Sequence, residues 1–229
     1  MGRVYTGSVT YVKGLNVVVY LTCMIITYHG AACIRASAGD TTLVLGPVSK
    51  KSKDFRPTNF GADVACIPLN HGDMNGFEES GRGEKKPFVI SGPGEYEVLG
   101  MTITGFGSVS KWDGLERTNT VYTVSFDGLS LLYLGAQSSA ALSKDVLEMD
   151  EPDILVLPVG GRGALAPAEA HKVSVNLGAK IVIPILYDEK TLKQFLKEAG
   201  SENAKPEEKL TLKPKDVVGK ENEVVVLVS

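Results

Sequence analysis

The sequence predicts a protein of the α/β (α+β) class, in which sheets meet helices on one face and a second sheet on the other. Three observations support this prediction. The first half of the chain reads as short strands separated by turn residues, and the second half places helical patterns between apolar strands. With 229 residues, of which 43% are hydrophobic, the chain is long enough to bury a large core.

The earliest strands are predicted to form a compact meander. Segments 26–30, 32–37 and 41–46 combine apolar with β-branched residues, and Gly39-Asp40 supplies a two-residue hairpin turn between the last two. Residues 63–69 then form a continuous apolar run, which is typical of a buried strand. Three further segments bounded by Gly or Pro complete the first half as strands: 87–92, 95–100 and 102–106.

A second hairpin and the first helix follow. Asp127-Gly128 is a strong turn signal between the apolar segments 119–126 and 129–135. Ser143 is a favourable N-cap residue, so residues 143–149 are predicted to form a short helix. The strand-rich pattern therefore extends to the middle of the chain before helices begin.

The remaining elements alternate between buried strands and helices. Residues 167–178 carry Pro167 at the start and Gly178 at the end, which mark the two ends of a helix. Residues 191–200 place their apolar side chains on one face, as an amphipathic helix does. Strands are predicted at 153–161 and 180–186 and, near the end of the chain, in KLTLKPKD and EVVVLVS.

We expect one domain over residues 24–229, preceded by an extension over residues 1–23 that offers one extra strand. The apolar run at 14–28 is rich in Val, Ile, Tyr and Thr, which suits strands, and it is shorter than a membrane-spanning helix. Residues 201–229 close the domain as a polar linker followed by a strand pair. No membrane segment is therefore expected.

Charge and cysteine content exclude several classes of function. The formal net charge is −3 and basic residues form no cluster longer than a pair, so we expect no binding to nucleic acid. The three cysteines include no CxxC pair, and Cys33 and Cys66 lie within apolar strand-like runs, where Cys acts as a small hydrophobic residue. This cysteine usage favours a cytoplasmic protein.

Several segments in a fixed order carry a family resemblance. They are ITYHGAACIRASAGDTTLVLGP, ADVACIPLNHGDMN, FVISGPGEYEVLGMTITGF, TVYTVSFDGLSLLYLGAQSS, PDILVLPVGGRG and AKIVIPILY. Together they resemble the metallo-β-lactamase fold over residues 24–200, in particular its branch of small Zn-dependent hydrolase-like proteins similar to ascorbate-phosphate lactonases. This resemblance implies a four-layer αββα sandwich with a metal site at one edge, between the sheets.

The resemblance also places the metal site, and this chain departs from the family there. In the family a His-x-His-x-Asp-His motif follows a strand, and ligands two residues apart on an extended loop point to the same side. Residues 69–74 occupy that motif, where only His71 and Asp73 are ligand-type residues and Leu69 and Met74 replace histidines. The later ligand positions of the family fall on Trp112, Ala136 and Leu186.

These replacements predict a degenerate site without a metal. Two ligands cannot hold Zn²⁺ against water, because zinc sites in proteins use three or four protein ligands. We therefore expect no cofactor, with Zn at His71 and Asp73 as the alternative. A structural role for the two residues also stays open, with Asp73 accepting hydrogen bonds from backbone N–H groups of its own loop.

Five residues at the same edge are candidates for ligand binding. A site lined by large apolar side chains would be a dry pocket or a filled part of the core. Arg162 is the one basic side chain expected there, and its guanidinium suits an anionic group. The complete set of candidates is Asn70, Met74, Trp112, Arg162 and Leu186.

The functional prediction follows from an intact scaffold that lacks most of its metal ligands. We expect a metal-free, non-catalytic protein that serves as a binding or assembly module, either for an unknown protein or small-molecule partner or within a homo-oligomer. The alternative is a metal-dependent hydrolase of a phosphate ester or lactone, with an unconventional single metal at His71 and Asp73.

Overall fold

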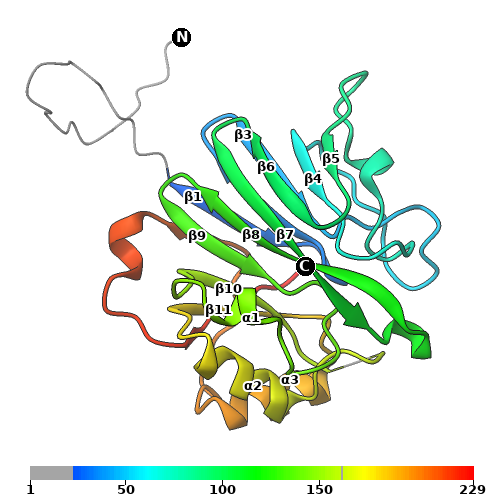
Figure 1. The fold of residues 1–229 in the computed structure, drawn as a ribbon. Helices are drawn as coiled ribbons and strands as arrows, with labels where there is room; N and C mark the ends of the chain where they lie inside the picture. The colour runs from blue at the N-terminus through cyan, green and yellow to red at the C-terminus, as the bar shows by residue number, and fades with distance from the viewer. Residues whose placement is uncertain (1–22, 161) are drawn as a thin grey trace, which may run out of the picture.

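Two β-sheets packed face to face form the body of the molecule (Figure 1). The computed structural model describes residues 23–160 and 162–229. Except for its last residue, the extension predicted over residues 1–23 lies outside these described residues.

The first sheet contains six strands within residues 23–160 and 162–229. In spatial order they are β12 (Leu210–Leu212), β1 (Met24–Tyr28), β2 (Ile34–Ala38), β3 (Thr41–Leu45), β4 (Val64–Cys66) and β5 (Phe88–Ile90). The predicted meander is confirmed, since β1, β2 and β3 pair antiparallel and Gly39-Asp40 forms the turn between β2 and β3. Side chains of β1 and β2 alternate between buried and half-buried, because successive residues of a strand point to opposite faces.

The second sheet contains seven strands in the part of the chain that the structure describes. In spatial order they are β13 (Glu223–Val224), β11 (Ile181–Ile185), β10 (Ile154–Pro158), β9 (Leu129–Tyr133), β8 (Arg117–Phe126), β7 (Met101–Ser110) and β6 (Gly94–Val98). Strands β6 to β9 pair antiparallel, whereas β9, β10, β11 and β13 pair parallel. The predicted hairpin between β8 and β9 is confirmed, with φ of 50° at Asp127 and 76° at Gly128, as a type I′ turn requires.

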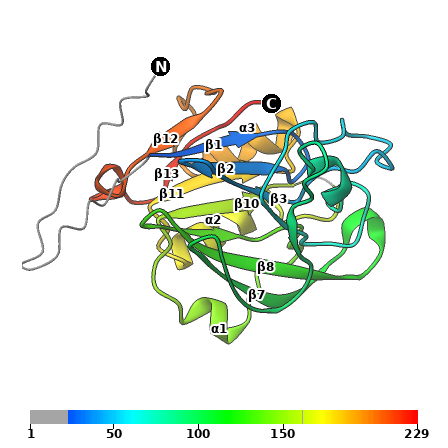
Figure 2. The same ribbon diagram turned by 90° about the horizontal axis from the view of Figure 1, so that it is seen from above.

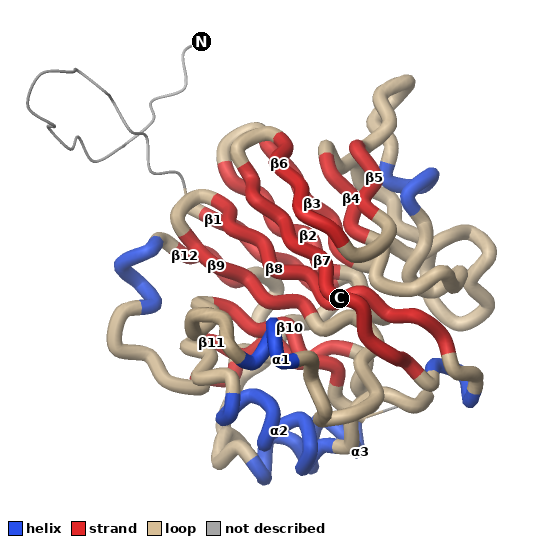
Figure 3. Tube along the Cα trace, in the orientation of Figure 1, coloured by secondary structure: helices blue, strands red, loops and turns tan. Residues whose placement is uncertain are grey.

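The α-helices of the described chain follow the strands of the second sheet (Figures 2 and 3). They are α1 (Lys144–Leu147), α2 (Pro167–Asn176) and α3 (Glu189–Glu198). The predicted N-cap is confirmed, because Ser143 Oγ accepts a hydrogen bond from Val146 N. Helix α3 begins two residues before the predicted start, since the Asp188 carboxylate caps it by accepting from Thr191 N at 2.8 Å. Three 3₁₀ turns complete the secondary structure of the described residues: η1 (Phe77–Ser80), η2 (Trp112–Gly114) and η3 (Pro214–Val217).

Strands β10 and β11 separate two cores. Ile154 and Val156 belong to the main core between the sheets, whereas Leu155 and Leu157 belong to a second core that includes residues of α2 and α3. Both strands are buried along their whole length, as expected for parallel strands covered on both faces. The predicted α+β sandwich is confirmed. No helix among the described residues is long and apolar enough to span a membrane.

Cys33 and Cys66 lie in the main core, as predicted. Both are fully buried, and this burial raises the pKa of the Cys33 thiol to about 12 and also raises the pKa of Cys66. A cysteine nucleophile needs an accessible thiol with a lowered pKa. These two residues are therefore excluded as nucleophiles.

The C-terminal residues contribute one strand to each sheet. Strand β12 pairs antiparallel with β1 at the end of the first sheet, and β13 pairs parallel with β11 at the end of the second. The segment 201–229 therefore ends both sheets on the side opposite β5 and β6.

Several connections meet at one edge of the sandwich. The turn η2 after β7 is tied to the loop after β10, because Asp113 N donates to Arg162 O at 3.1 Å. The loop after β11 is tied to the loop after β1, because Leu186 N donates to Ala31 O at 3.1 Å. The loop that follows β4 carries the predicted ligand residues to this edge.

Candidate functional site

A tight turn after β4 fixes His71 and Asp73. His71 N donates to Leu69 O and Met74 N donates to His71 O, so the chain reverses direction within six residues. Asp73 N donates to His71 Nδ1 at 3.2 Å, which places the imidazole beside the carboxylate of Asp73. Gly72 packs closely against a neighbouring loop, since a Cβ there would lie 3.3 Å from the backbone of Lys51.

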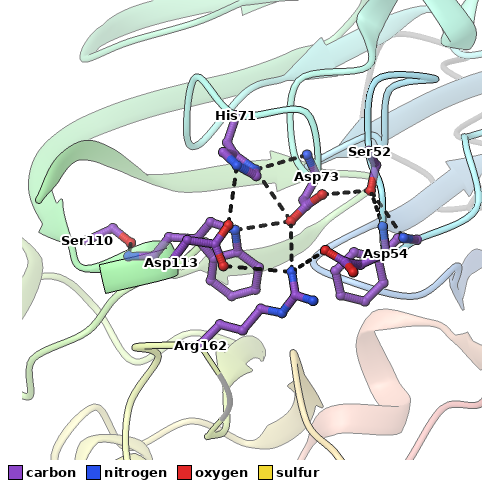
Figure 4. A network of polar contacts seen from close by, with 9 residues as sticks. Ser52, Asp54, His71, Asp73, Ser110, Asp113 and Arg162 are labelled. Atoms are coloured by element: carbon purple, nitrogen blue, oxygen red, sulfur yellow. Dashed lines mark hydrogen bonds and ion pairs between the residues drawn. The ribbon is translucent and has the colours of Figure 1, made fainter. Parts of the chain in front are cut away.

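The carboxylate of Asp73 is buried and held by two side chains from distant segments (Figure 4). It is 1% exposed; its Oδ1 accepts from Ser52 Oγ at 2.6 Å, and its Oδ2 accepts from Trp112 Nε1 at 3.1 Å. The hydrogen bonds to this carboxylate thus come from side chains, not from backbone N–H groups of its own loop. Because both of these donors are neutral, the carboxylate keeps its negative charge and can bind a cation.

Asp113 is a third ligand-type residue, and the sequence reasoning missed it. Its Oδ2 lies 3.4 Å from His71 Nε2, and its side chain is 39% exposed. Left-handed backbone at Asp113, with φ of 55°, lets the carboxylate turn back toward His71. The only sequence signal is the Asp-Gly pair that directly follows Trp112, and such pairs are common in ordinary turns.

His71, Asp73 and Asp113 form a group that suits one divalent cation. One ligand atom from each lies within 4.8 Å of the others, and no second such group of three occurs among the described residues. One imidazole and two carboxylates are the donors that Zn²⁺ and Mn²⁺ accept, and catalytic zinc sites use three protein ligands and keep one position open.

The contact between His71 and Asp73 supports this fit. Because Asp73 N donates to His71 Nδ1, that nitrogen carries no proton in this hydrogen-bonding pattern. Nδ1 and Asp73 Oδ2 are then two acceptors only 3.4 Å apart. With Nδ1 occupied by this hydrogen bond, Nε2 is the ring nitrogen left to bind a cation, and it lies 3.4 Å from Asp113 Oδ2.

Arg162 balances part of the negative charge at this site. Its Nη1 donates to Asp54 Oδ2 at 2.7 Å and lies 3.6 Å from Asp73 Oδ2 and 3.7 Å from Asp113 Oδ1. The hydrogen bond from Arg162 lowers the pKa of Asp54, and the same bond raises the pKa of Arg162. With His71 neutral, three carboxylates and one guanidinium leave a formal charge of −2, which a divalent cation would neutralise.

A cavity of about 360 Å³ adjoins the charged group. Three of the five predicted ligand-binding residues line it, namely Trp112, Arg162 and Leu186. The other two do not: Met74 is fully buried in the core, and exposed Asn70 accepts a hydrogen bond from Asn75 Nδ2 at 2.9 Å. The remaining lining residues of this cavity are Tyr28, Phe55, Tyr187 and Asp188.

A larger cavity of about 600 Å³ lies next to the first and shares Phe55 with it. Its lining contains none of the three ligand-type residues, and its histidine is His29. His29 bonds Thr27 Oγ1 at 2.9 Å, and burial lowers its pKa. The smaller cavity is not lined by these three residues either, but its lining includes Trp112 and Arg162, which both contact Asp73, so it is the cavity connected to the charged group.

Left-handed backbone gathers at this edge. Ala31, Asp113, Arg162 and Leu186 all have positive φ, between 43° and 57°. A residue other than glycine costs about 1–2 kcal/mol in this region, and such strain concentrates at functional sites. The strain supports a functional assignment for the edge that these residues share.

A family model described as a β-lactamase superfamily domain matches residues 25–186. This chain belongs to the metallo-β-lactamase superfamily. A relative from Methanocorpusculum labreanum is 36% identical over 186 residues, covering 71% of this chain and 82% of the relative. Another from Methanoregula boonei is 33% identical over 190 residues, covering 72% and 82%. Both relatives are named UPF0173 metal-dependent hydrolase.

A solved structure of the same superfamily has a similar fold. It comes from Thermotoga maritima and is described as a candidate Zn-dependent hydrolase. It is 27% identical to this chain, with a TM-score of 0.67, over 89% of this chain and 98% of that one. The resemblance to the metallo-β-lactamase fold in the sequence is thereby confirmed.

The prediction of a metal-free, non-catalytic module is wrong, and its premise of a degenerate site is not supported. Relatives of this superfamily member are named metal-dependent hydrolases, which favours the alternative prediction. Only His71 and Asp73 stand at ligand positions of the family motif. Asp113 stands next to Trp112, outside those positions, and the fold turns it toward His71, where it completes a group of three.

Proposed function

We propose that this protein is a metal-dependent hydrolase with a single divalent cation held by His71, Asp73 and Asp113. The observation that carries this proposal is the convergence of the three ligand-type groups within 4.8 Å at one edge of the sandwich. When bound, a divalent cation would lower the pKa of a coordinated water to about 7 and so supply a nucleophile at neutral pH.

The residues of the chain have separate tasks in this proposal. Asp73 is a rigid ligand, because Ser52 and Trp112 fix its two oxygens. Asp113 is more exposed and sits on the solvent side of the group. His71 lies between the two carboxylates, with Nδ1 3.4 Å from Asp73 Oδ2 and Nε2 3.4 Å from Asp113 Oδ2.

The cavity beside these ligands is the proposed substrate site. Trp112 and Leu186 provide apolar walls that exclude water, and Arg162 provides a cationic group. Phosphate esters and lactones are the substrate classes proposed, because attack by water on either centre builds negative charge that a cation stabilises. We also propose a cytoplasmic location, since the cysteines of the described chain are free thiols.

Hydrolysis assays on metal-depleted protein test this function. Zn²⁺ or Mn²⁺ is added back, and turnover of p-nitrophenyl phosphate and of the lactone dihydrocoumarin is measured. We expect activity only with metal and a loss of at least about 100-fold in kcat/KM for H71A, D73N and D113N, because each removes a ligand.

The control is Asp150→Asn, which removes an exposed carboxylate outside the group of three and should retain full activity. Bound metal is measured in parallel by elemental analysis of each variant. A wild-type protein that takes up no metal, or an H71A variant that keeps both metal and activity, would contradict the proposal.

A further inference from the structure

Arg162 contacts the carboxylates that a cation would use. Its Nη1 lies 3.6 Å from Asp73 Oδ2 and 3.7 Å from Asp113 Oδ1, besides its 2.7 Å hydrogen bond to Asp54 (Figure 4). Asp73 and Asp113 are two of the three groups able to hold the cation. Because like charges repel strongly at such distances, the guanidinium and a divalent cation compete for these oxygens.

The other contacts of Arg162 do not depend on these carboxylates. Its Cζ lies 5.4 Å from the centre of the Phe55 ring and 5.9 Å from the centre of the Trp112 ring. Both rings line the 360 Å³ cavity together with Arg162. A guanidinium released from Asp73 can therefore keep its aromatic contacts and direct its N–H groups to an anion in the cavity.

The lining of the cavity defines the ligand that fits it. Arg162 is its one cationic residue, and the lone carboxylate, that of Asp188, already caps α3 by accepting from Thr191 N. The rest of the lining is aromatic or apolar and suits a flat apolar body: Tyr28, Phe55, Trp112, Leu186 and Tyr187.

We propose that a divalent cation displaces Arg162 from Asp73 and Asp113, and that the released guanidinium then binds the anionic group of a substrate with a flat apolar body. This inference rests on the proposed hydrolase function and adds to it a substrate class and an order of binding. Because binding free energies are linked, the cation tightens binding of the anion, and the anion tightens binding of the cation by the same factor.

Isothermal titration calorimetry with Mn²⁺ and phenylphosphonate tests the exchange. Phenylphosphonate carries the required ring and anion and has no ester bond to hydrolyse. In the wild type it should bind at least about tenfold more tightly at saturating Mn²⁺ than without it. Arg162→Ala should bind Mn²⁺ at least about tenfold more tightly than the wild type, because the competing charge is gone, and should show no such coupling.

Two further variants make the result specific. Arg162→Gln removes the charge but keeps a polar side chain, and should behave as Arg162→Ala does even if the alanine variant folds poorly. Arg56→Ala removes the same charge from an exposed residue whose side chain lines the other cavity. It should leave both affinities within about twofold of the wild type, because Arg56 forms no ion pair with Asp73 or Asp113 among the described residues.

Each outcome of the titrations supports or refutes the exchange between Arg162 and the cation. Equal Mn²⁺ affinity in the wild type and in the Arg162 variants would overturn the exchange and leave the proposed function standing. Coupling that survives in both variants would also overturn the exchange, since the phosphonate would then bind the cation directly. A wild type that shows the exchange but hydrolyses no ester or lactone supports the exchange and refutes the hydrolase. Absence of Mn²⁺ binding in every protein refutes both.

Discussion

Asp73 gives the sharpest test of how this site is built. Two buried hydrogen bonds converge on its carboxylate, from Ser52 at 2.6 Å and from Trp112 at 3.1 Å. Asp73→Asn can keep both contacts, because the amide oxygen still accepts from Trp112 and the amide nitrogen can donate to Ser52 Oγ. Asp73→Ala removes both and leaves the Trp112 N–H, which is almost fully buried, without a partner.

The expected magnitudes follow from these contacts. A hydrogen bond to a charged group contributes about 1.5–3 kcal/mol and a neutral one about 0.5–1.5 kcal/mol, so Asp73→Asn loses about 1 kcal/mol per bond. Relief of the buried charge offsets part of this loss, which leaves a net cost of about 1 kcal/mol. Asp73→Ala should cost about 2–4 kcal/mol, because it also strands a buried donor.

Urea unfolding followed by far-UV circular dichroism measures both variants. The midpoints should fall in the order wild type, Asp73→Asn, Asp73→Ala, with a common dependence on urea. Both variants should bind Mn²⁺ at least about tenfold more weakly, since each removes an anionic ligand. If Asp73→Ala is as stable as Asp73→Asn, the bond from Trp112 contributes nothing and the argument for a rigid ligand is refuted.

Three further predictions concern the rest of the molecule. Burial acts to raise the pKa of Asp153, but hydrogen bonds, chiefly from Lys180, outweigh burial and lower that pKa. The ionised carboxylate therefore stabilises the fold above the ordinary carboxyl pKa, and this contribution is lost as pH falls below about 4. In acid unfolding, Asp153→Asn should lose less folding free energy between neutral and acidic pH than the wild type does. Mn²⁺ at 100 times its Kd should stabilise the fold by about 2.7 kcal/mol and change the emission of Trp112, the single tryptophan; an unchanged melting temperature would count against binding. Gly163→Ala should cost at least about 2 kcal/mol in thermal unfolding, because φ is 92° and a Cβ would lie 2.3 Å from Lys111 O; a variant as stable as wild type would show that this contact yields easily.

Local sequence signals were enough to predict most of the fold. Turn pairs such as Gly39-Asp40 and Asp127-Gly128 act within a few residues, so the hairpins they mark could be predicted without knowing the rest of the structure. The partners of β12 and β13 could not, because pairing with β1 and β11 depends on contacts across most of the chain. The start of α3 was misplaced for a smaller reason, since the Asp188 cap was not recognised.

The candidate site was harder to predict because it is assembled from distant segments. His71 and Asp73 could be found, since they share one loop and match a family motif. Asp54 and Asp113 could not, because packing and backbone direction bring them to Arg162 from positions 108 and 49 residues away in the sequence (162 − 54 and 162 − 113). A non-ligand residue at a family ligand position, such as Trp112, therefore does not exclude a ligand at the next position, such as Asp113.

The arrangement of β12 and β13 has a practical consequence for producing this protein. The family match ends at residue 186, so a fragment trimmed to that match would lose both strands. Strands β1 and β11 would then each present a row of unpaired N–H and C=O groups, one in each sheet. Such a fragment should aggregate through strand addition, so expression of this protein should retain residues 187–229.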